Sequence, residues 1–242
     1  MTFSYDGSNF YGYQKQIKER TIQDEIEKAL TKINGDIRVS IHASGRTDAG
    51  VHAYNQKAHF DLDKELDVSK LKHSLNGMLP DDIYIKDIQI VDDDFHARFS
   101  VKAKEYIYKI NLDLYNPIER NYVYQLNKRL DIPEVERALK YLEGTHNFKS
   151  FTKPNDEKDD YVRTIVQATL ERDPKNVNRI TISLLGNGFL RYMVRNIVGL
   201  LIEVGTGKIK SEEVISILAK EDRKSAGLCA PACGLYLKDV FY

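Results

Sequence analysis

The spacing of apolar residues changes repeatedly along this chain, and these changes limit the folds that it can adopt. Over residues 22–33 the apolar side chains recur every three or four positions, which indicates a helix that Thr21 would cap. At Ile37, Val39 and Ile41 they alternate with polar residues, as in a half-buried strand. Strands and helices follow one another until the pattern restarts after residue 95. The sequence therefore predicts an α+β protein with two halves, residues 1–100 and 101–242.

The same spacing rules predict the other elements of both halves. Strands are expected at residues 2–5, 37–42, 51–60, 83–91, 103–112, 161–171, 179–185 and 235–240. Helices are expected at residues 21–34, 68–75, 132–142 and 188–204, with one more starting at Ser211. Residues 152–160 are expected to form a polar, charged loop.

Composition excludes several classes of protein. Of the 242 residues, 42% are hydrophobic and 30% are charged, and the formal net charge is zero. A nucleic-acid partner would therefore have to bind a local basic patch. The opening MTFSYDGSNF has no secretory pattern, and no apolar run is long enough to span a membrane, so we expect a cytoplasmic protein. Cys229 and Cys233 are expected to be reduced thiols.

One short turn concentrates reactive side chains between two expected strands. The stretch HASGRTDAGVHA, residues 42–53, places Asp48 between Gly45 and Gly50, which permit a sharp turn. Most aspartates at such a tip simply face water, so this turn alone is weak support for chemistry. Its histidines, His42 and His52, could suggest a metal site with Asp48, but no compact ligand spacing supports one, and none is expected.

An arginine in an apolar helix supports a functional role for Asp48 in this turn. Arg195 lies in the stretch GFLRYMVRNIVGLLIEVG, which is apolar on two adjacent faces. A buried guanidinium requires a carboxylate partner, because an unpaired buried charge costs several kcal/mol. Arg195 could instead reach the surface, or pair with Glu203 or another acid. If it pairs with Asp48, it would lower the pKa of that carboxyl and fix its direction.

An aromatic strand offers a third candidate. In KEYIYKI, Tyr106 and Tyr108 have the spacing of neighbours on one strand face, which is typical of core packing. A phenol beside a carboxylate and an arginine could also stack on a planar base or move a proton. Basic residues that could contact phosphates form three groups: Lys15, Lys18 and Arg20; Arg98, Lys102 and Lys104; Lys149 and Lys153.

Five segments in order resemble the tRNA pseudouridine synthase A family over nearly the whole chain. They are SGRTDAGVHA (44–53), FHARFS to KEYIY (95–108), GTHNFKSF (144–151), GNGFLRYMVRNIVG (186–199) and APACGLYL (230–237). The most specific piece is GRTDAGVH. The family commonly has tryptophan where this chain has Tyr13, and several more residues before TFSYDG.

The resemblance implies roles for five residues. Asp48 matches the catalytic aspartate, and Arg195 matches the arginine that pairs with it. Tyr106 matches the tyrosine that lines the uracil pocket, Arg46 matches an arginine that helps extrude the target nucleotide, and Leu235 lies in the strand that walls the pocket.

The resemblance also implies a fold and an activity. The expected fold is the pseudouridine synthase fold, two α/β halves whose antiparallel sheets join across a central active-site cleft. The expected enzyme is a cofactor-free, homodimeric isomerase that converts uridine to pseudouridine in the tRNA anticodon stem-loop, at positions 38–40. Two alternatives remain, which are an RNA-binding module without catalysis and a carboxylate-dependent nucleoside glycosylase.

Overall fold

The structure is a computed structural model that describes residues 1–63, 66–153 and 160–242. Most of the polar loop predicted at residues 152–160 therefore lies outside the described residues. The chain forms two compact units. Unit 1 contains Met1–Lys102 and Tyr236–Tyr242, and unit 2 contains Ala103–Leu235. The predicted division at residues 100 and 101 assigned the closing strand to the second half, whereas its contacts place it in unit 1.

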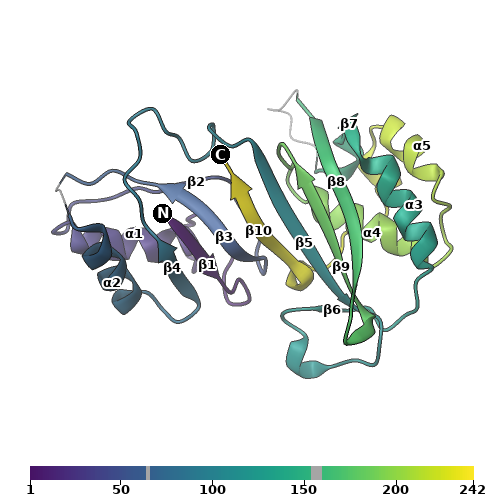
Figure 1. The fold of residues 1–242 in the computed structure, drawn as a ribbon, viewed down its shortest axis with the longest axis horizontal. Coiled ribbons are helices and arrows are strands. Elements are labelled where there is room, and N and C mark those ends of the chain that lie inside the picture. The colour runs from purple at the N-terminus through teal and green to yellow at the C-terminus, as the bar shows by residue number, and fades with distance from the viewer. Residues whose placement is uncertain (64–65, 154–159) are drawn as a thin grey trace. The chain divides into compact units, whose positions relative to one another are not determined.

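Unit 1 is built on a mostly antiparallel sheet with the strand order β4-β1-β3-β10 (Figure 1). The strands are β1 (Thr2–Tyr5), β3 (His52–His59), β4 (Ile83–Asp87) and β10 (Leu235–Phe241). β1 runs antiparallel to both β3 and β4, and the short β2 (His42–Ala43) also pairs with β3. β10 is parallel to β3, with Tyr236 opposite His52. The last strand therefore lies beside the strand that follows the Asp48 turn.

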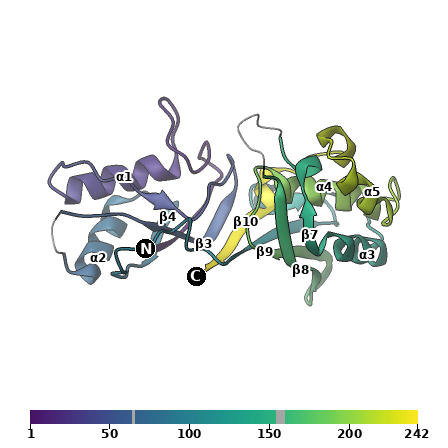
Figure 2. The same ribbon diagram turned by 90° about the horizontal axis from the view of Figure 1, so that it is seen from above.

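Two helices complete unit 1. α1 (Ile22–Ile33) buries Ile22, Ile26 and Leu30, which form its predicted apolar stripe. Thr21 occupies the N-cap position of α1 as predicted, but its side chain makes no capping hydrogen bond. α2 (Val68–Met78) packs against both α1 and β4 (Figure 2).

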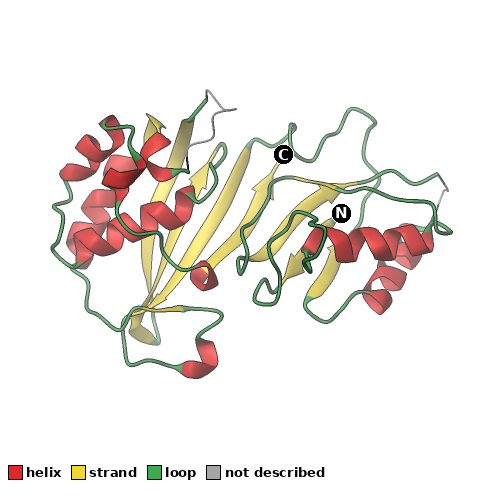
Figure 3. Cartoon of the chain, turned by 180° about the vertical axis from the view of Figure 1, so that it is seen from behind, coloured by secondary structure: helices red, strands yellow, loops and turns green. Residues whose placement is uncertain are grey.

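Unit 2 contains antiparallel strands with helices on one face. Its strand order is β5-β9-β8-β7, with the short β6 (Tyr124–Gln125) parallel to β5. The four main strands are β5 (Ala103–Asn111), β7 (Gly144–Asn147), β8 (Val162–Asp173) and β9 (Asn176–Gly186). Figure 3 shows the helices on one side of these strands; they are α3 (Ile132–Leu142), α4 (Met193–Gly205) and α5 (Glu213–Ala219).

The strand predicted at 83–91 ends at Asp87, and two other predicted elements differ from the structure for local reasons. The segment 37–41 forms no strand, because side chains of α1 take its backbone donors. Val39 N donates to Thr31 Oγ1 at 3.1 Å, and Ile41 N donates to Glu27 Oε1 at 3.2 Å. The helix predicted from residue 188 begins only at Met193, because Tyr192 has a left-handed backbone with φ 64° and ψ 0°.

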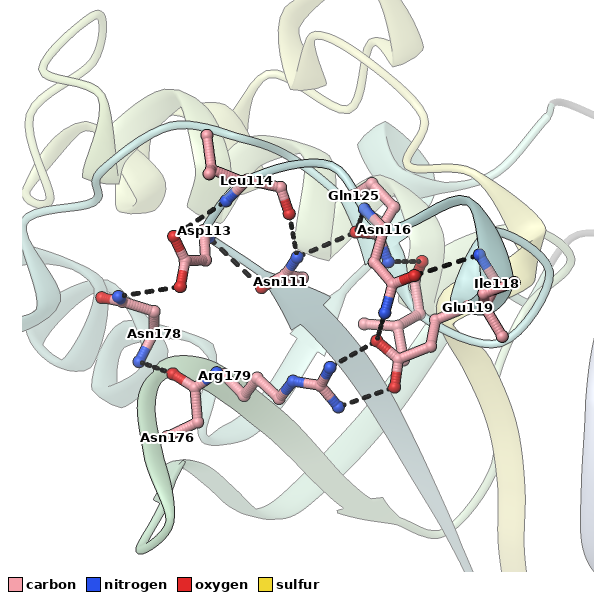
Figure 4. Close-up of polar contacts among 11 residues, drawn as sticks. Asn111, Asp113, Leu114, Asn116, Ile118, Glu119, Gln125, Asn176, Asn178 and Arg179 are labelled. Atoms are coloured by element: carbon pink, nitrogen blue, oxygen red, sulfur yellow. Dashed lines mark hydrogen bonds and ion pairs between the residues drawn. The ribbon is translucent and has the colours of Figure 1, made fainter.

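The connection between β5 and α3 is fixed to unit 2 by polar side chains (Figure 4). Asn111 Nδ2 donates to the carbonyl of Leu114 and to Gln125 Oε1, at 3.0 and 2.8 Å. Arg179 on β9 forms two hydrogen bonds with the carboxylate of Glu119, which lies in a 3₁₀ turn, Pro117–Glu119. This connection therefore has a defined conformation although it contains little regular structure. No helix among the described residues is long and apolar enough to cross a membrane.

Candidate active site

Asp48 lies in the loop between β2 and β3 of unit 1, and its side chain is half-buried. Hydrogen bonds fix the loop on the side that precedes Asp48. Ser44 N donates to the Lys57 carbonyl at 2.8 Å, and Ser44 Oγ donates to Gln56 Oε1 at 2.7 Å. Gln56 Nε2 donates in turn to the Gly45 carbonyl at 3.0 Å. Because Ser44 and Gln56 are fully buried, water does not compete for these bonds.

The residue next to Asp48 is held at both its side chain and its backbone. Thr47 Oγ1 lies 2.7 Å from the hydroxyl of Tyr5, and the Thr47 carbonyl accepts from Tyr13 N at 3.1 Å. Burial raises the pKa of Tyr5 to about 12, so its hydroxyl keeps its proton at neutral pH. Val51 N donates to the Asp48 carbonyl at 3.2 Å and closes the turn. The backbone on both sides of the carboxylate is therefore fixed.

Glycine is required where the loops around Asp48 approach each other. Gly50 has φ 76°, as expected for a sharp turn, and Gly12 has φ 96°. A Cβ added at Gly12 would lie 2.9 Å from the Thr47 carbonyl oxygen. The sequence analysis identified Gly50 but missed Gly12. Gly12 lies in the loop that follows β1, and no spacing in the sequence links it to the Asp48 turn.

The two histidines of the turn have structural partners. His52 Nδ1 accepts from Gly7 N and lies 3.1 Å from Asp6 Oδ1, and its ring stacks on Tyr236. His42 instead stacks on His59. Across the described part of the chain, no group of three or more His, Cys, Asp or Glu residues has the arrangement of a metal site. Arg46 is exposed, two residues before Asp48.

In unit 2, Arg195 is the third residue of α4 and is half-buried. Its Nε donates to the Ala230 carbonyl at 2.8 Å, while Ala230 N donates back to the Arg195 carbonyl at 3.0 Å. Burial raises the pKa of the Cys233 thiol, and the nearby charge of Arg195 opposes this effect. These contacts fix the guanidinium against residues 230–233. Its pairing with Asp48 stays a prediction.

The two tyrosines of β5 have different environments. Tyr108 is fully buried, its hydroxyl donates to the Pro231 carbonyl at 2.7 Å, and burial raises its pKa well above the ordinary value. It is a core residue. Tyr106 pairs with Leu184 of β9 and keeps 8% of its surface exposed, and the centres of its ring and the Phe189 ring are 5.1 Å apart. Leu235, at the start of β10, is 6% exposed.

The first predicted basic group is partly neutralised inside unit 1. Lys15 pairs with Asp24 at 2.7 Å, and Arg20 forms two hydrogen bonds with the carboxylate of Asp82 at 2.7 and 2.9 Å. Paired cations of this kind attract phosphates less than free ones. In the third group, Lys149 also has an acidic partner, with its Nζ 3.9 Å from Glu221 Oε2.

Comparison with known proteins places these features in one family. Residues 1–100 and 138–242 match the family described as tRNA pseudouridine synthase. A tRNA pseudouridine synthase A from Bacillus pumilus is 47% identical over 244 residues, covering 100% of this chain and 97% of that protein. Proteins of the same name from Anoxybacillus flavithermus and Streptococcus mutans are 45% and 43% identical, over 241 and 240 residues. They cover 100% and 99% of this chain, and 97% and 96% of their own lengths.

Proposed function

Because this chain belongs to the tRNA pseudouridine synthase family, we propose that it isomerises uridine to pseudouridine in tRNA. The proposed target is the anticodon stem-loop, just 3′ of the anticodon. The observation that carries the proposal is the Asp48 loop, where buried hydrogen bonds fix the backbone on both sides of a single carboxylate. A protein that only binds RNA gains nothing from an aimed carboxylate among phosphates.

The reaction conserves the atoms of the nucleotide. The bond between N1 of uracil and C1′ of ribose breaks, the base turns, and C5 bonds to the same C1′. C5 loses its proton and N1 gains one, so the mass does not change and no cofactor is consumed. Asp48 could attack C1′, add to C6 of uracil, or remove the C2′ proton. All three routes require an ionised carboxylate that is held in one direction.

Arg195 is the proposed partner of that carboxylate. A guanidinium fixed beside it would favour the ionised form and hold its orientation. The support from unit 2 is that Arg195 Nε donates to the Ala230 carbonyl at 2.8 Å, which holds the guanidinium in one position. The proposal includes a central cleft between the two halves, in which Asp48 and Arg195 meet.

Three further residues complete the proposed site. Tyr106 would stack on the uracil and could take the C5 proton. Leu235 would help to wall the pocket and keep water from the detached base. Arg46 would occupy the space that the flipped nucleotide leaves in the stem, a role supported by its exposure. The proposed enzyme acts in the cytoplasm as a homodimer.

The decisive experiment maps pseudouridine in tRNA incubated with this protein and with an Asp48→Asn variant. We expect conversion by the native protein, and binding without conversion by Asp48→Asn. An Asp93→Asn variant, which changes an exposed loop aspartate, serves as the matched control and should convert tRNA normally. RNA of unchanged mass that contains no pseudouridine would support a binding module instead, and loss of a base would identify a glycosylase.

A further inference from the structure

A surface pocket of about 300 Å³ lies within unit 2. It is lined by Lys153, Tyr192, Asn196, Arg223 and Cys229. Its volume lies at the lower limit of ligand-binding sites, which suits a group no larger than part of one nucleotide. The side chains that line it indicate the charge of that group.

Arg223 contributes a positioned positive charge to this pocket. Its Nη2 donates to Asn196 Oδ1 at 2.8 Å, and its Nη1 donates to the Gly227 carbonyl at 2.9 Å. Asn196 is 1% exposed and is itself fixed, because its Nδ2 donates to the Phe151 carbonyl at 2.6 Å. Both acceptors are neutral, and within residues 1–63, 66–153 and 160–242 no ion pair compensates the guanidinium. Its remaining N–H donors can therefore bind an anion.

Further cations surround the same pocket. Lys153 lines it directly and makes no ion pair within the described chain. The guanidinium carbons of Arg191 and Arg195 lie 4.9 and 5.4 Å from the centre of the Tyr192 ring. The positive charges of Lys153 and Arg223, which form no ion pair with the described residues, favour a dianion or a nucleic-acid phosphate over a neutral ligand.

The position of the pocket selects between these anions. Tyr192 lines the pocket and contacts Arg195, so the pocket borders the arginine proposed to act in catalysis. A phosphate adjoining the reacting nucleotide must lie close to that arginine in any bound RNA.

We propose that the pocket formed by Lys153, Tyr192 and Arg223 binds a backbone phosphate of the substrate RNA, next to the nucleotide that reacts. Arg223 and Lys153 supply the charge, and Asn196 positions Arg223. This inference rests on the proposed function, since it names how the same substrate is held.

The test is the salt dependence of tRNA binding. We expect Lys153→Gln and Arg223→Gln each to lower the slope of log Kd against log salt by about 0.7–1, and the double variant by about twice as much. Lys224→Gln is the matched control, because it removes one charge from the residue after Arg223 without lining the pocket. Its slope should equal that of the native protein. Equal slopes for Arg223→Gln and Lys224→Gln would overturn the proposal.

A second measurement protects the test against a folding defect. Arg223→Gln removes two hydrogen bonds, whereas the Lys153 side chain makes none with the described residues, so we expect Lys153→Gln to fold normally. In the native protein, tRNA should slow the alkylation of the exposed Cys229 by iodoacetamide, which peptide mass spectrometry measures. Lys153→Gln should weaken this protection at physiological salt. Unchanged alkylation of Cys229 in the presence of saturating tRNA would refute the proposal.

The two proposals fail in different ways. If the native protein forms pseudouridine but the pocket variants keep the native slope, only the phosphate pocket is wrong. If the native protein binds tRNA with the predicted slopes but forms no pseudouridine, the catalytic proposal is wrong and the pocket stands. If it neither binds nor converts tRNA, both are refuted.

Discussion

The hydrogen bond between Tyr5 and Thr47 fixes the residue directly before Asp48, and its removal should be measurable. The two oxygens are 2.7 Å apart in a buried environment. Tyr5→Phe deletes one hydroxyl and leaves the Thr47 hydroxyl buried, since Thr47 is 9% exposed. Removing one partner of a buried pair costs about 1–3 kcal/mol. We expect Tyr5→Phe to lower the free energy of unfolding by about 1–2 kcal/mol.

A double-mutant cycle isolates the hydrogen bond from other effects. Thr47→Val removes the second hydroxyl and keeps the side-chain shape, so the double variant places two apolar groups where the hydrogen bond was. Such a replacement can be nearly neutral, because neither partner is left unsatisfied. We expect the double variant to be less destabilised than the sum of the single variants, by about 1 kcal/mol.

Urea unfolding followed by far-ultraviolet circular dichroism measures these differences. Because the pKa of Tyr5 is about 12, its hydroxyl stays protonated throughout an assay at neutral pH. Tyr11→Phe is the control, since Tyr11 is 59% exposed, and it should change stability by less than about 0.5 kcal/mol. If the costs of Tyr5→Phe and Thr47→Val add to within about 0.3 kcal/mol, the proposed coupling does not exist.

The same variant should also affect turnover if Asp48 is catalytic. Loss of the Tyr5 contact frees the Thr47 side chain, while the Tyr13 contact still holds its carbonyl. Partial loss of the orientation of the Asp48 carboxylate should lower kcat by about tenfold, which is less than the roughly hundredfold loss expected if the carboxylate moved by about 1 Å. Native kcat in a correctly folded Tyr5→Phe protein would show that this contact serves stability alone.

Three other variants test separate features. Gly12→Ala should lower both the free energy of unfolding and kcat, because Gly12 has φ 96° and a Cβ there would lie 2.9 Å from the Thr47 carbonyl oxygen. Normal thermal unfolding and normal turnover of this variant would contradict the close packing of these loops. Tyr106→Phe should keep tRNA binding but slow pseudouridine formation if the phenol moves a proton, and full turnover would leave Tyr106 only a stacking role. Burial, followed by the charges of His96 and His42, lowers the pKa of His59 below its ordinary value of 6.5. As the pH drops below 6.5, the unfolded chain binds a proton at His59 more readily than the folded protein does, so the melting temperature should fall. This fall should be smaller in a His59→Gln variant than in a His73→Gln control.

Elements governed by local sequence were predicted well. α3 begins and ends as predicted, at Ile132 and Leu142, because its apolar spacing and the proline in its first turn act within the helix itself. The start of α4 was wrong because the left-handed conformation of Tyr192 is not visible in the apolar pattern. Residues 37–41 were predicted as a strand because their alternation reports burial of Val39 and Ile41. The alternation of apolar and polar residues carries no information on the side chains of α1 that accept hydrogen bonds from Val39 N and Ile41 N.

The same distinction between local and long-range features applies to the residues of the candidate site. Asp48 and its turn were identified from twelve consecutive residues, and the family resemblance supplied Arg46, Tyr106, Arg195 and Leu235. The groups that hold the turn lie far from it in sequence, since Tyr5 is 42 positions from Thr47. No periodicity links such pairs, so Tyr5, Gln56 and Gly12 could be found only in three dimensions.

The return of β10 to the first sheet has a consequence for how the protein is made. A ribosome translates β1, β3 and β4 first, then all of unit 2, and only then the strand that pairs with β3. Until that moment β3 offers an unpaired edge with which another nascent chain could associate. The sheet of the aspartate-bearing unit is therefore completed only when the last strand has been translated.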